Sequence, residues 1–224
     1  MPIMTGFTTN EGSLYVDKQM STSSQFSGFW RTLLPQLSEE DLNTITYLYP
    51  EPSQSQEGSK YLEERPGVGP MYKRIEAAYA HYAYVAPVRQ TASFASVDVP
   101  VYLYHWALVG NAIDGARHGD NMWYETRDPR KLDLSETQDA LSGTLHAYIT
   151  SFICTGSPNS VKGPYSDRPS WCAYENSTPK IMIFGETNKE LVGGDIGPPA
   201  EFKDDTWANE ECKFWWSKVE ISQN

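Results

Sequence analysis

The sequence predicts an α/β protein, because short apolar segments with strand character alternate along the chain with longer segments of helical character. The strand-like segments are residues 2–7, 99–106 and 180–184. The helical segments are residues 37–49, 69–94, 135–156 and 209–219. With 224 residues and 39% hydrophobic content, the chain has the composition of one globular domain.

The first strand-like segment, residues 2–7, runs directly into the polar loop of residues 8–13. A buried parallel strand needs a partner on each side. A chain that opens on such a strand is therefore expected to be the later part of a larger fold. Residues 99–106 alternate and are rich in β-branched and aromatic residues, which indicates a second strand, and residues 180–184 form the third.

Two helical segments lie in the first half of the chain. Residues 37–49 have Ser38 as a good N-cap and Pro50 as a stop signal. Residues 69–94 form the second helical region, which we expect to be interrupted near Pro87 because proline lacks a backbone N–H.

The clearest helix in the sequence begins after Ser135. Ser135 and Gln138 have the spacing of a capping box, and Gly156 ends the helix. Five large apolar residues fall on one face of this helix, namely Leu141, Leu145, Tyr148, Ile149 and Phe152. A last short helix is expected at residues 209–219.

The charge balance excludes two classes of partner. Eighteen basic residues stand against 29 acidic ones, a net charge of −11, with no basic run to offset it. This argues against nucleic acid or an anionic membrane as a partner. The sequence also contains no run of eighteen apolar residues that would form a transmembrane helix, and its first residues lack the features of a signal peptide.

Glu11 and His118 are the candidate catalytic residues. Each lies in a loop that follows a predicted strand, and an acid followed by a histidine is the order that a serine hydrolase of α/β type requires. His81, His105 and His146 fall within predicted helix or strand, which favours packing or hydrogen-bonding roles for them. Glu11 would accept a hydrogen bond from the His118 ring and fix its tautomer.

The nucleophile that should precede this pair is missing. No Gly-x-Ser-x-Gly elbow occurs in the 224 residues. Loss of the nucleophile costs a serine hydrolase on the order of a million-fold in turnover, about 8 kcal/mol of transition-state stabilisation. We therefore expect negligible hydrolytic activity from this polypeptide alone.

A metal site is not expected. Asp114, His118 and Asp120 lie within seven residues and offer oxygen and nitrogen ligands, but no second histidine stands at helical spacing. No Cys-x-x-Cys motif occurs either. We predict that the chain binds neither a metal nor a cofactor.

The two candidate segments, in their order, resemble the C-terminal part of the type-B carboxylesterases, the group that includes cholinesterases and fungal esterases and lipases. The acid segment matches at Pro2, Gly6, Glu11 and Gly12, and the histidine segment at His118, Gly119 and Tyr124. Further matches follow in order at residues 84–89, 101–104, 156–159, Trp171 with Tyr174, and 212–215. Asn121 departs from the acidic residue that many members have there, and Cys172 replaces the proline that usually follows the tryptophan.

This resemblance implies a fold and an activity. Residues 1–224 would form a single partial domain, the C-terminal portion of an α/β-hydrolase fold with a mostly parallel central sheet flanked by helices, whose N-terminal half is absent. The intact protein would be a serine carboxylic-ester hydrolase acting on a small-molecule ester. This chain would supply the acid and the histidine, and its missing N-terminal half would be its partner.

Two alternatives remain open. One is a non-catalytic, cholinesterase-like module for protein interaction, but such a protein has little reason to keep both Glu11 and His118. The other is a self-standing small domain, which predicts cooperative unfolding, whereas the hydrophobic edge of residues 2–7 predicts marginal solubility.

Secretion is implied by the resemblance, since many family members are extracellular. Three cysteines, Cys154, Cys172 and Cys212, allow one disulfide with one thiol left over, and the sequence does not decide which two pair. Asn176 opens an Asn-Ser-Thr triplet and is a candidate glycosylation site.

Overall fold

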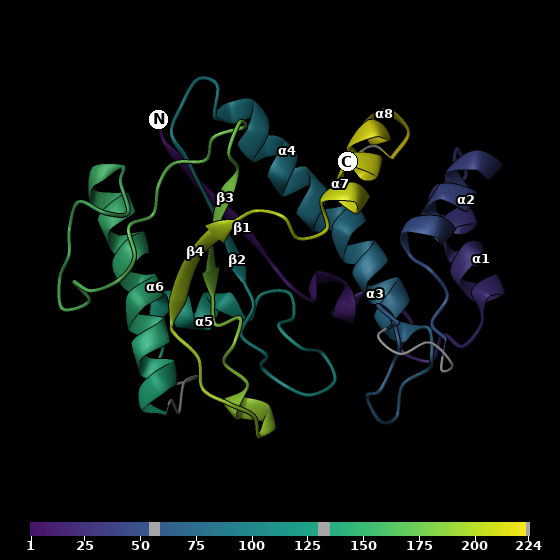
Figure 1. The fold of residues 1–224 in the computed structure, drawn as a ribbon, viewed down its shortest axis with the longest axis horizontal. Helices are drawn as coiled ribbons and strands as arrows, with labels where there is room; N and C mark the ends of the chain where they lie inside the picture. The colour runs from purple at the N-terminus through teal and green to yellow at the C-terminus, as the bar shows by residue number, and fades with distance from the viewer. Residues whose placement is uncertain (54–58, 130–134, 223–224) are drawn as a thin grey trace. The chain divides into compact units, whose positions relative to one another are not determined.

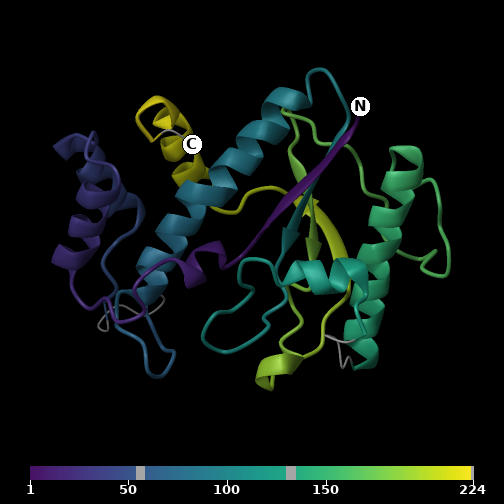
Figure 2. The same ribbon diagram turned by 180° about the vertical axis from the view of Figure 1, so that it is seen from behind.

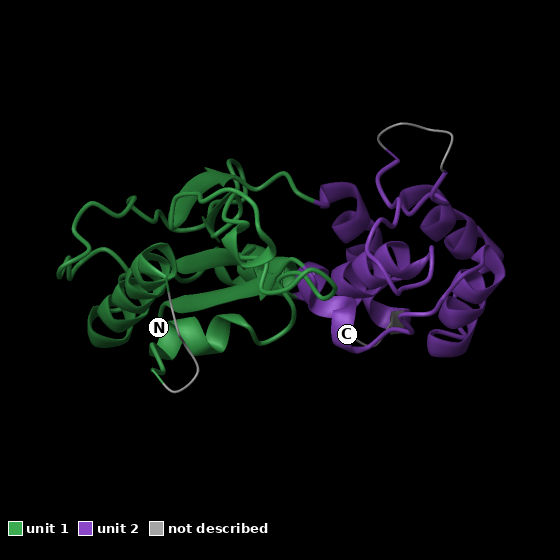
Figure 3. Cartoon of the chain, turned by 90° about the horizontal axis from the view of Figure 1, so that it is seen from below, with its two compact units in different colours: residues 1–9, 88–207 green, residues 10–87, 208–224 purple. Residues whose placement is uncertain are grey.

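The computed structural model describes residues 1–53, 59–129 and 135–222, which divide into two compact units (Figure 3). Unit 1 comprises Met1–Thr9 and Val88–Trp207, and contains the β-sheet. Unit 2 comprises Asn10–Pro87 and Ala208–Asn224, and its described residues are mainly helical.

The sheet of unit 1 has four strands in the order β1-β2-β3-β4. These are β1 (Ile3–Thr8), β2 (Val101–Trp106), β3 (Lys180–Phe184) and β4 (Ala200–Asp204). β1, β2 and β3 pair in parallel, and β4 is antiparallel to β3. The predicted α/β fold with a mostly parallel sheet is confirmed (Figure 1).

β4 was not predicted from the sequence. Three of its five residues are charged, so its composition is typical of a surface loop. Its side chains nevertheless alternate, because Ala200 and Phe202 pack against the unit 1 core while the charged residues lie between and beyond them. These residues form a strand because they pair with β3, which is a tertiary effect.

The first strand forms an edge of the sheet, as predicted for residues 2–7. Within the described residues, β1 pairs with β2 alone (Figure 2). Accordingly, only Phe7 and Thr8 of this strand are buried. Gly6 lies against Tyr104 on β2 so closely that a Cβ would stand 2.5 Å from the Tyr104 ring, so only glycine fits there.

The two faces of the sheet are covered by different helices of unit 1. On one face, the aromatic and apolar side chains of β2 and β3 pack against Leu141, Leu145 and Tyr148 of α6 (Glu136–Thr155). On the other face, the Phe7 and His105 rings lie 4.9 Å apart. The guanidinium of Arg89, on α4 (Ala86–Ala95), lies over the Phe7 ring there. Alternation along the strands therefore buries both faces.

α6 matches its prediction at both ends. The Ser135 hydroxyl accepts a hydrogen bond from the backbone N–H of Gln138 at 3.3 Å, and Gly156 ends the helix in the left-handed conformation at φ 75°. In a full capping box, the Gln138 side chain would also accept a hydrogen bond from the Ser135 backbone N–H, but Gln138 makes a different bond. Its side-chain oxygen instead accepts a hydrogen bond from the Tyr124 hydroxyl at 3.0 Å.

Unit 2 contains helices α1, α2, α3, α7 and α8, a π-helical segment and a 3₁₀ turn. Their bounds are α1 (Ser23–Leu33), α2 (Glu39–Leu48), α3 (Tyr72–Ala80), η2 (His81–Val85), α7 (Asn209–Ser217), α8 (Val219–Ser222) and η1 (Glu11–Leu14). α2 has its predicted Ser38 cap. α1 was not predicted, although Thr22 and Gln25 form a capping box at its start that could have indicated it. The largest buried side chains of unit 2 include Trp30, Tyr49 and Trp215.

The helical region near Pro87 is continuous rather than interrupted. α3 passes into the π-helical segment His81–Val85, and α4 begins at the next residue. The proline ring crowds the carbonyl four residues earlier, and a wider π turn relieves that crowding. None of the helices within the described residues is long and apolar enough to cross a membrane.

Candidate functional site

Glu11 lies in unit 2, three residues after the end of β1, and opens the 3₁₀ turn η1. Its side chain is buried, with 4% exposed. Two backbone hydrogen bonds hold the turn, from the Ser13 N–H to the Asn10 carbonyl at 3.2 Å and from the Tyr15 N–H to the Gly12 carbonyl at 3.0 Å. A Cβ on Gly12 would lie 2.2 Å from a backbone carbonyl oxygen of α3, so the residue after Glu11 must be glycine.

A buried carboxyl, Glu76 on α3, lies beside this turn. The Asn10 side-chain amide donates a hydrogen bond to Glu76 Oε1 at 2.6 Å, and both terminal nitrogens of Arg65 lie 3.4 Å from Oε2. Burial raises the pKa of Glu76 to about 7, although Arg65 and the Asn10 hydrogen bond oppose that rise.

The sequence analysis did not identify Glu76. The signal was present, since Glu76 follows Tyr72 by four residues, which places a charged residue on the same face of the helix as an aromatic one. Tyr72 and Ile75 are both fully buried, and Glu76 is 2% exposed. A carboxyl in such a position costs free energy unless it has partners.

The raised pKa of Glu76 predicts a pH-dependent stability. The folded state holds this proton more tightly than the unfolded chain, where the ordinary pKa is 4.5. Raising the pH from about 4.5 through about 7 therefore lowers the free energy of unfolding, by about 3 kcal/mol for this group. Urea unfolding across pH 4.5–8 should show this loss in the wild type and not in Glu76→Gln or Glu76→Leu. Parallel pH profiles for the three proteins would contradict it.

His118 lies in unit 1 at an exposed turn between β2 and α5 (Asn121–Thr126). The Asp120 N–H donates to the Arg117 carbonyl at 3.2 Å, so His118 and Gly119 are the central residues of a β-turn. Gly119 has φ 84°, the left-handed conformation that the second central residue of a type II turn requires.

The Asp120 side chain closes this turn. The Arg117 Nε donates to Asp120 Oδ1 at 2.8 Å, and the Arg117 backbone N–H donates to Oδ2 at 3.2 Å. The Asp120 carboxylate thus joins the two ends of the turn, Arg117 and Asp120, on either side of His118 and Gly119. The ion pair and the glycine together present His118 at the tip of a braced turn.

Substituting Gly119 tests this geometry. Gly119→Ala is expected to lower the free energy of unfolding by about 1–2 kcal/mol, since an alanine in the left-handed region brings its Cβ against the following carbonyl. Gly119→Asn should lose less, because asparagine tolerates that region better. Urea unfolding of the three proteins measures both values. Equal stability of Gly119→Ala and wild type would show that the turn does not need the positive φ.

Asn121, at the position where the family is often acidic, links the turn to the sheet. Its side-chain amide donates to Glu125 Oε1 at 2.6 Å and to the Tyr104 hydroxyl at 3.3 Å. The Tyr104 hydroxyl also donates to Glu125 Oε1 at 3.0 Å. The carboxylate in this network therefore belongs to Glu125, one helical turn later.

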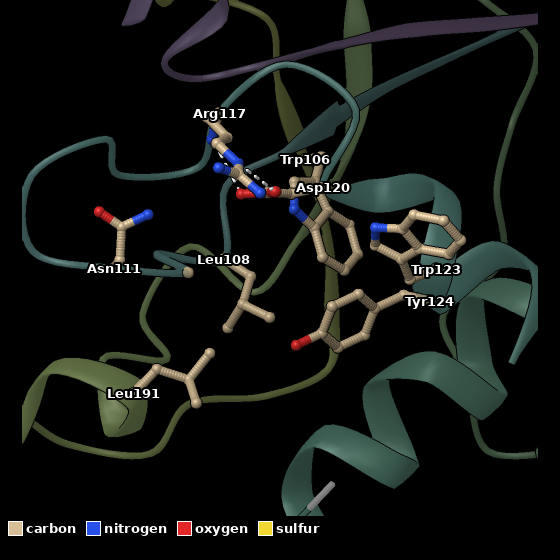
Figure 4. Close-up of a pocket in the computed structure, with 9 residues that line it drawn as sticks. Trp106, Leu108, Asn111, Arg117, Asp120, Trp123, Tyr124 and Leu191 are labelled. Atoms are coloured by element: carbon tan, nitrogen blue, oxygen red, sulfur yellow. Dashed lines mark hydrogen bonds and ion pairs between the residues drawn. The ribbon is translucent and has the colours of Figure 1, made fainter. Parts of the chain in front are cut away.

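A cavity of about 200 Å³ in unit 1 borders the His118 turn (Figure 4). Its polar wall includes the Arg117–Asp120 ion pair. Its apolar wall includes Trp106 and Trp123. The remaining lining residues are Leu108, Gly110, Asn111, Tyr124 and Leu191, the last from the short 3₁₀ helix η3 (Glu190–Val192). The cavity therefore exposes both a charged pair and two tryptophan rings.

The other three histidines make hydrogen bonds, as predicted. His81 Nδ1 lies 3.0 Å from the Tyr49 hydroxyl, and His105 Nε2 lies 2.7 Å from Thr9 Oγ1. His146 Nδ1 lies 2.7 Å from the Glu125 carbonyl oxygen.

Some predictions about individual residues stay untested. Among the described residues, no group of three His, Cys, Asp or Glu side chains could hold a metal, so Asp114, His118 and Asp120 are not brought together as ligands.

Cys154 and Cys172 are exposed and Cys212 is buried, and the predicted disulfide stays a prediction. Asn176 is exposed in a turn, where its side-chain amide donates to the Ser93 carbonyl at 3.0 Å. Pairing of Glu11 in unit 2 with His118 in unit 1 also stays a prediction.

Comparison with known proteins gives one curated relative and two solved structures of note. Secreted lipase 4 of Gibberella zeae is 28% identical over 227 residues, which cover 98% of this chain and 36% of the lipase. Aspergillus niger EstA superposes with a TM-score of 0.79 at 20% identity, over 100% of this chain and 41% of EstA. A PNB esterase superposes with a TM-score of 0.63 at 16% identity, over 96% of this chain and 38% of the esterase.

The two structural matches establish the fold, and the chain spans about two fifths of the length of each. The family assignment comes from the sequence profile of the Carboxylesterase family, which matches residues 1–215. The chain therefore belongs to the carboxylesterase family.

Proposed function

We propose that this chain is the C-terminal portion of a serine carboxylic-ester hydrolase and supplies Glu11 and His118 to its catalytic triad. The observation that carries the proposal is topological. Glu11 and His118 follow β1 and β2, which are neighbouring parallel strands. In α/β folds, catalytic residues lie beyond the carboxyl ends of such strands.

The proposed chemistry divides between this chain and the rest of the enzyme. His118 would take the proton of a serine hydroxyl as the serine attacks the ester carbonyl, and would return it to the leaving alcohol. Glu11 would accept a hydrogen bond from the imidazole and stabilise the imidazolium that forms. The serine and the oxyanion hole would come from the remainder of the protein, because the 224 residues contain no Gly-x-Ser-x-Gly.

A chimera tests this proposal. Residues 1–224 would replace the aligned segment of the Gibberella zeae secreted lipase, which covers 36% of that protein. We expect the chimera to hydrolyse p-nitrophenyl butyrate and the isolated 224-residue chain to show no turnover above buffer. A chimera that folds, as judged by its melting transition, but does not hydrolyse the ester would contradict the proposal and favour a non-catalytic interaction module.

Two further properties belong to the same proposal. We infer that residues 1–224 make up one partial domain, and that the protein is extracellular and glycosylated at Asn176. The similarity to a secreted lipase and the exposure of Asn176 support this. After expression in a fungal secretory host, the peptide containing Asn176 should lose mass on enzymatic deglycosylation. An unmodified peptide from secreted protein would overturn the assignment.

A further inference from the structure

The acid loop, defined as Asn10–Ser13, is attached to α3 through specific contacts within unit 2. Asn10 occupies the N-cap position of η1, yet its side chain makes no capping hydrogen bond. Its amide donates to Glu76 Oε1 at 2.6 Å instead. The Tyr72 hydroxyl donates to the Ser13 carbonyl at 3.3 Å, so α3 holds both ends of the loop.

Glu76 is itself held from the other side. Its second oxygen faces Arg65, whose terminal nitrogens lie at 3.4 Å. Arg65 in turn is fixed by Glu63, with its Nε at 2.8 Å from Oε1 and a terminal nitrogen at 2.6 Å from Oε2. The Arg65 guanidinium also lies 4.6 Å from the centre of the Tyr72 ring. One oxygen of Glu76 therefore remains directed at Asn10.

Packing alone does not explain a carboxyl at this position. The side chain is 2% exposed on a helix face shared with fully buried apolar residues. Replacing an entire buried ion pair by apolar groups of similar volume is often neutral or stabilising, so packing does not require a charged pair at such a place. The raised pKa of Glu76 shows the same cost of burial. The two groups that Glu76 binds are Arg65 and the Asn10 amide, and the Asn10 contact, at 2.6 Å, is the shorter of the two.

We propose that Glu76 is a positioning residue, which acts through Asn10 to hold the acid loop and so to aim Glu11. This inference rests on the proposed function, because Glu11 is the residue that would be aimed. Glu76 itself would touch neither the substrate nor the serine. The amide of Asn10 needs only an acceptor, so a glutamine at position 76 can still hold the loop, whereas leucine cannot.

Hydrogen exchange on the full 224-residue chain tests the inference without any activity. The probes are the Ser13 and Tyr15 amides, whose hydrogen bonds close the acid loop. We expect Glu76→Leu and Asn10→Ala each to speed their exchange about tenfold, the effect of losing one hydrogen bond. Glu76→Gln should recover most of the protection. The double variant Asn10→Ala/Glu76→Leu should be no faster than either single variant, because both remove the same contact.

A matched control separates positioning from general destabilisation. Glu63 is a buried carboxylate that also binds Arg65, and no hydrogen bond joins it to the acid loop among the contacts described here. Glu63→Gln should leave the exchange of the Ser13 and Tyr15 amides within about threefold of wild type. Because Glu76→Leu also removes a carboxylate from Arg65, its urea midpoint is measured in parallel, and exchange of the Ser13 and Tyr15 amides should accelerate more than exchange of other buried amides in unit 2. Equal acceleration in Glu63→Gln, or unchanged exchange in Glu76→Leu, would overturn the inference.

The chimera gives the second readout. Glu76→Leu should lower its kcat by about a hundredfold with little change in KM, as expected for a misplaced catalytic group. Glu76→Gln should recover most of that loss, and a kcat equal to wild type in Glu76→Leu would contradict positioning. Faster loop exchange together with a fully active Glu11→Gln chimera would support the contact between Glu76 and the loop and refute the proposed function instead.

Discussion

Replacing His118 by alanine is expected to lower the kcat of the chimera by about a million-fold, the loss seen when the base of a serine hydrolase triad is removed. His118 would be the only group placed to take the serine proton, so without it the hydroxyl stays a weak nucleophile. KM should change little, because the imidazole contributes to the transition state rather than to ester binding. Initial rates with p-nitrophenyl butyrate measure both parameters.

The control for this experiment is His146→Ala. His146 is an exposed histidine on α6 and, like His118, belongs to unit 1. It binds a backbone carbonyl of α5 and is not part of the proposed site. We expect His146→Ala to keep the wild-type kcat. A His118→Ala chimera with more than a hundredth of the wild-type kcat would show that another residue is the base.

Replacing Glu11 by glutamine is expected to lower kcat by about 10⁴-fold, a smaller loss than at His118. The acid of a triad does not transfer a proton itself. It orients the imidazole, selects its tautomer and stabilises the imidazolium, so an isosteric amide keeps the shape and loses these effects. The double variant Glu11→Gln/His118→Ala should be no slower than His118→Ala, because the two residues act as a unit.

Glu40→Gln is the matched control, since Glu40 is an exposed glutamate of α2 in the same unit. Its kcat should equal that of the wild type. If Glu11→Gln were to retain full activity in a chimera that loses activity on His118→Ala, a different carboxylate would be the triad acid. Losses that add fully in the double variant would likewise argue against a shared triad.

Local rules were sufficient for several elements. Ser38 caps α2, and Ser135 and Gly156 bound α6, as predicted from residue types that satisfy helix ends in any protein. The alternating, β-branched and aromatic residues of 99–106 were sufficient to predict β2, and the short apolar segment 180–184 was sufficient to predict β3. The acid and histidine loops were predictable because each follows such a strand, and because the order of motifs resembles one family.

Elements decided by distant contacts were not predictable in this way. β4 is a strand because β3 offers it an edge. The carboxylate that meets Asn121 comes from Glu125, and Gln138 binds Tyr124 rather than completing its capping box. In each case a local preference was weaker than a tertiary partner.

The sequence by itself therefore determined the family, the order of Glu11 and His118 after neighbouring strands, and the helices whose signals are local. The tertiary structure alone decided what surrounds those residues. The braced turn at His118 depends on the Arg117–Asp120 ion pair. The support of the acid loop depends on Glu76, which lies 66 residues from Asn10. The physical reason is that caps and strand periodicity act between near neighbours, whereas burial and hydrogen bonding of a carboxyl depend on what the folded chain places beside it.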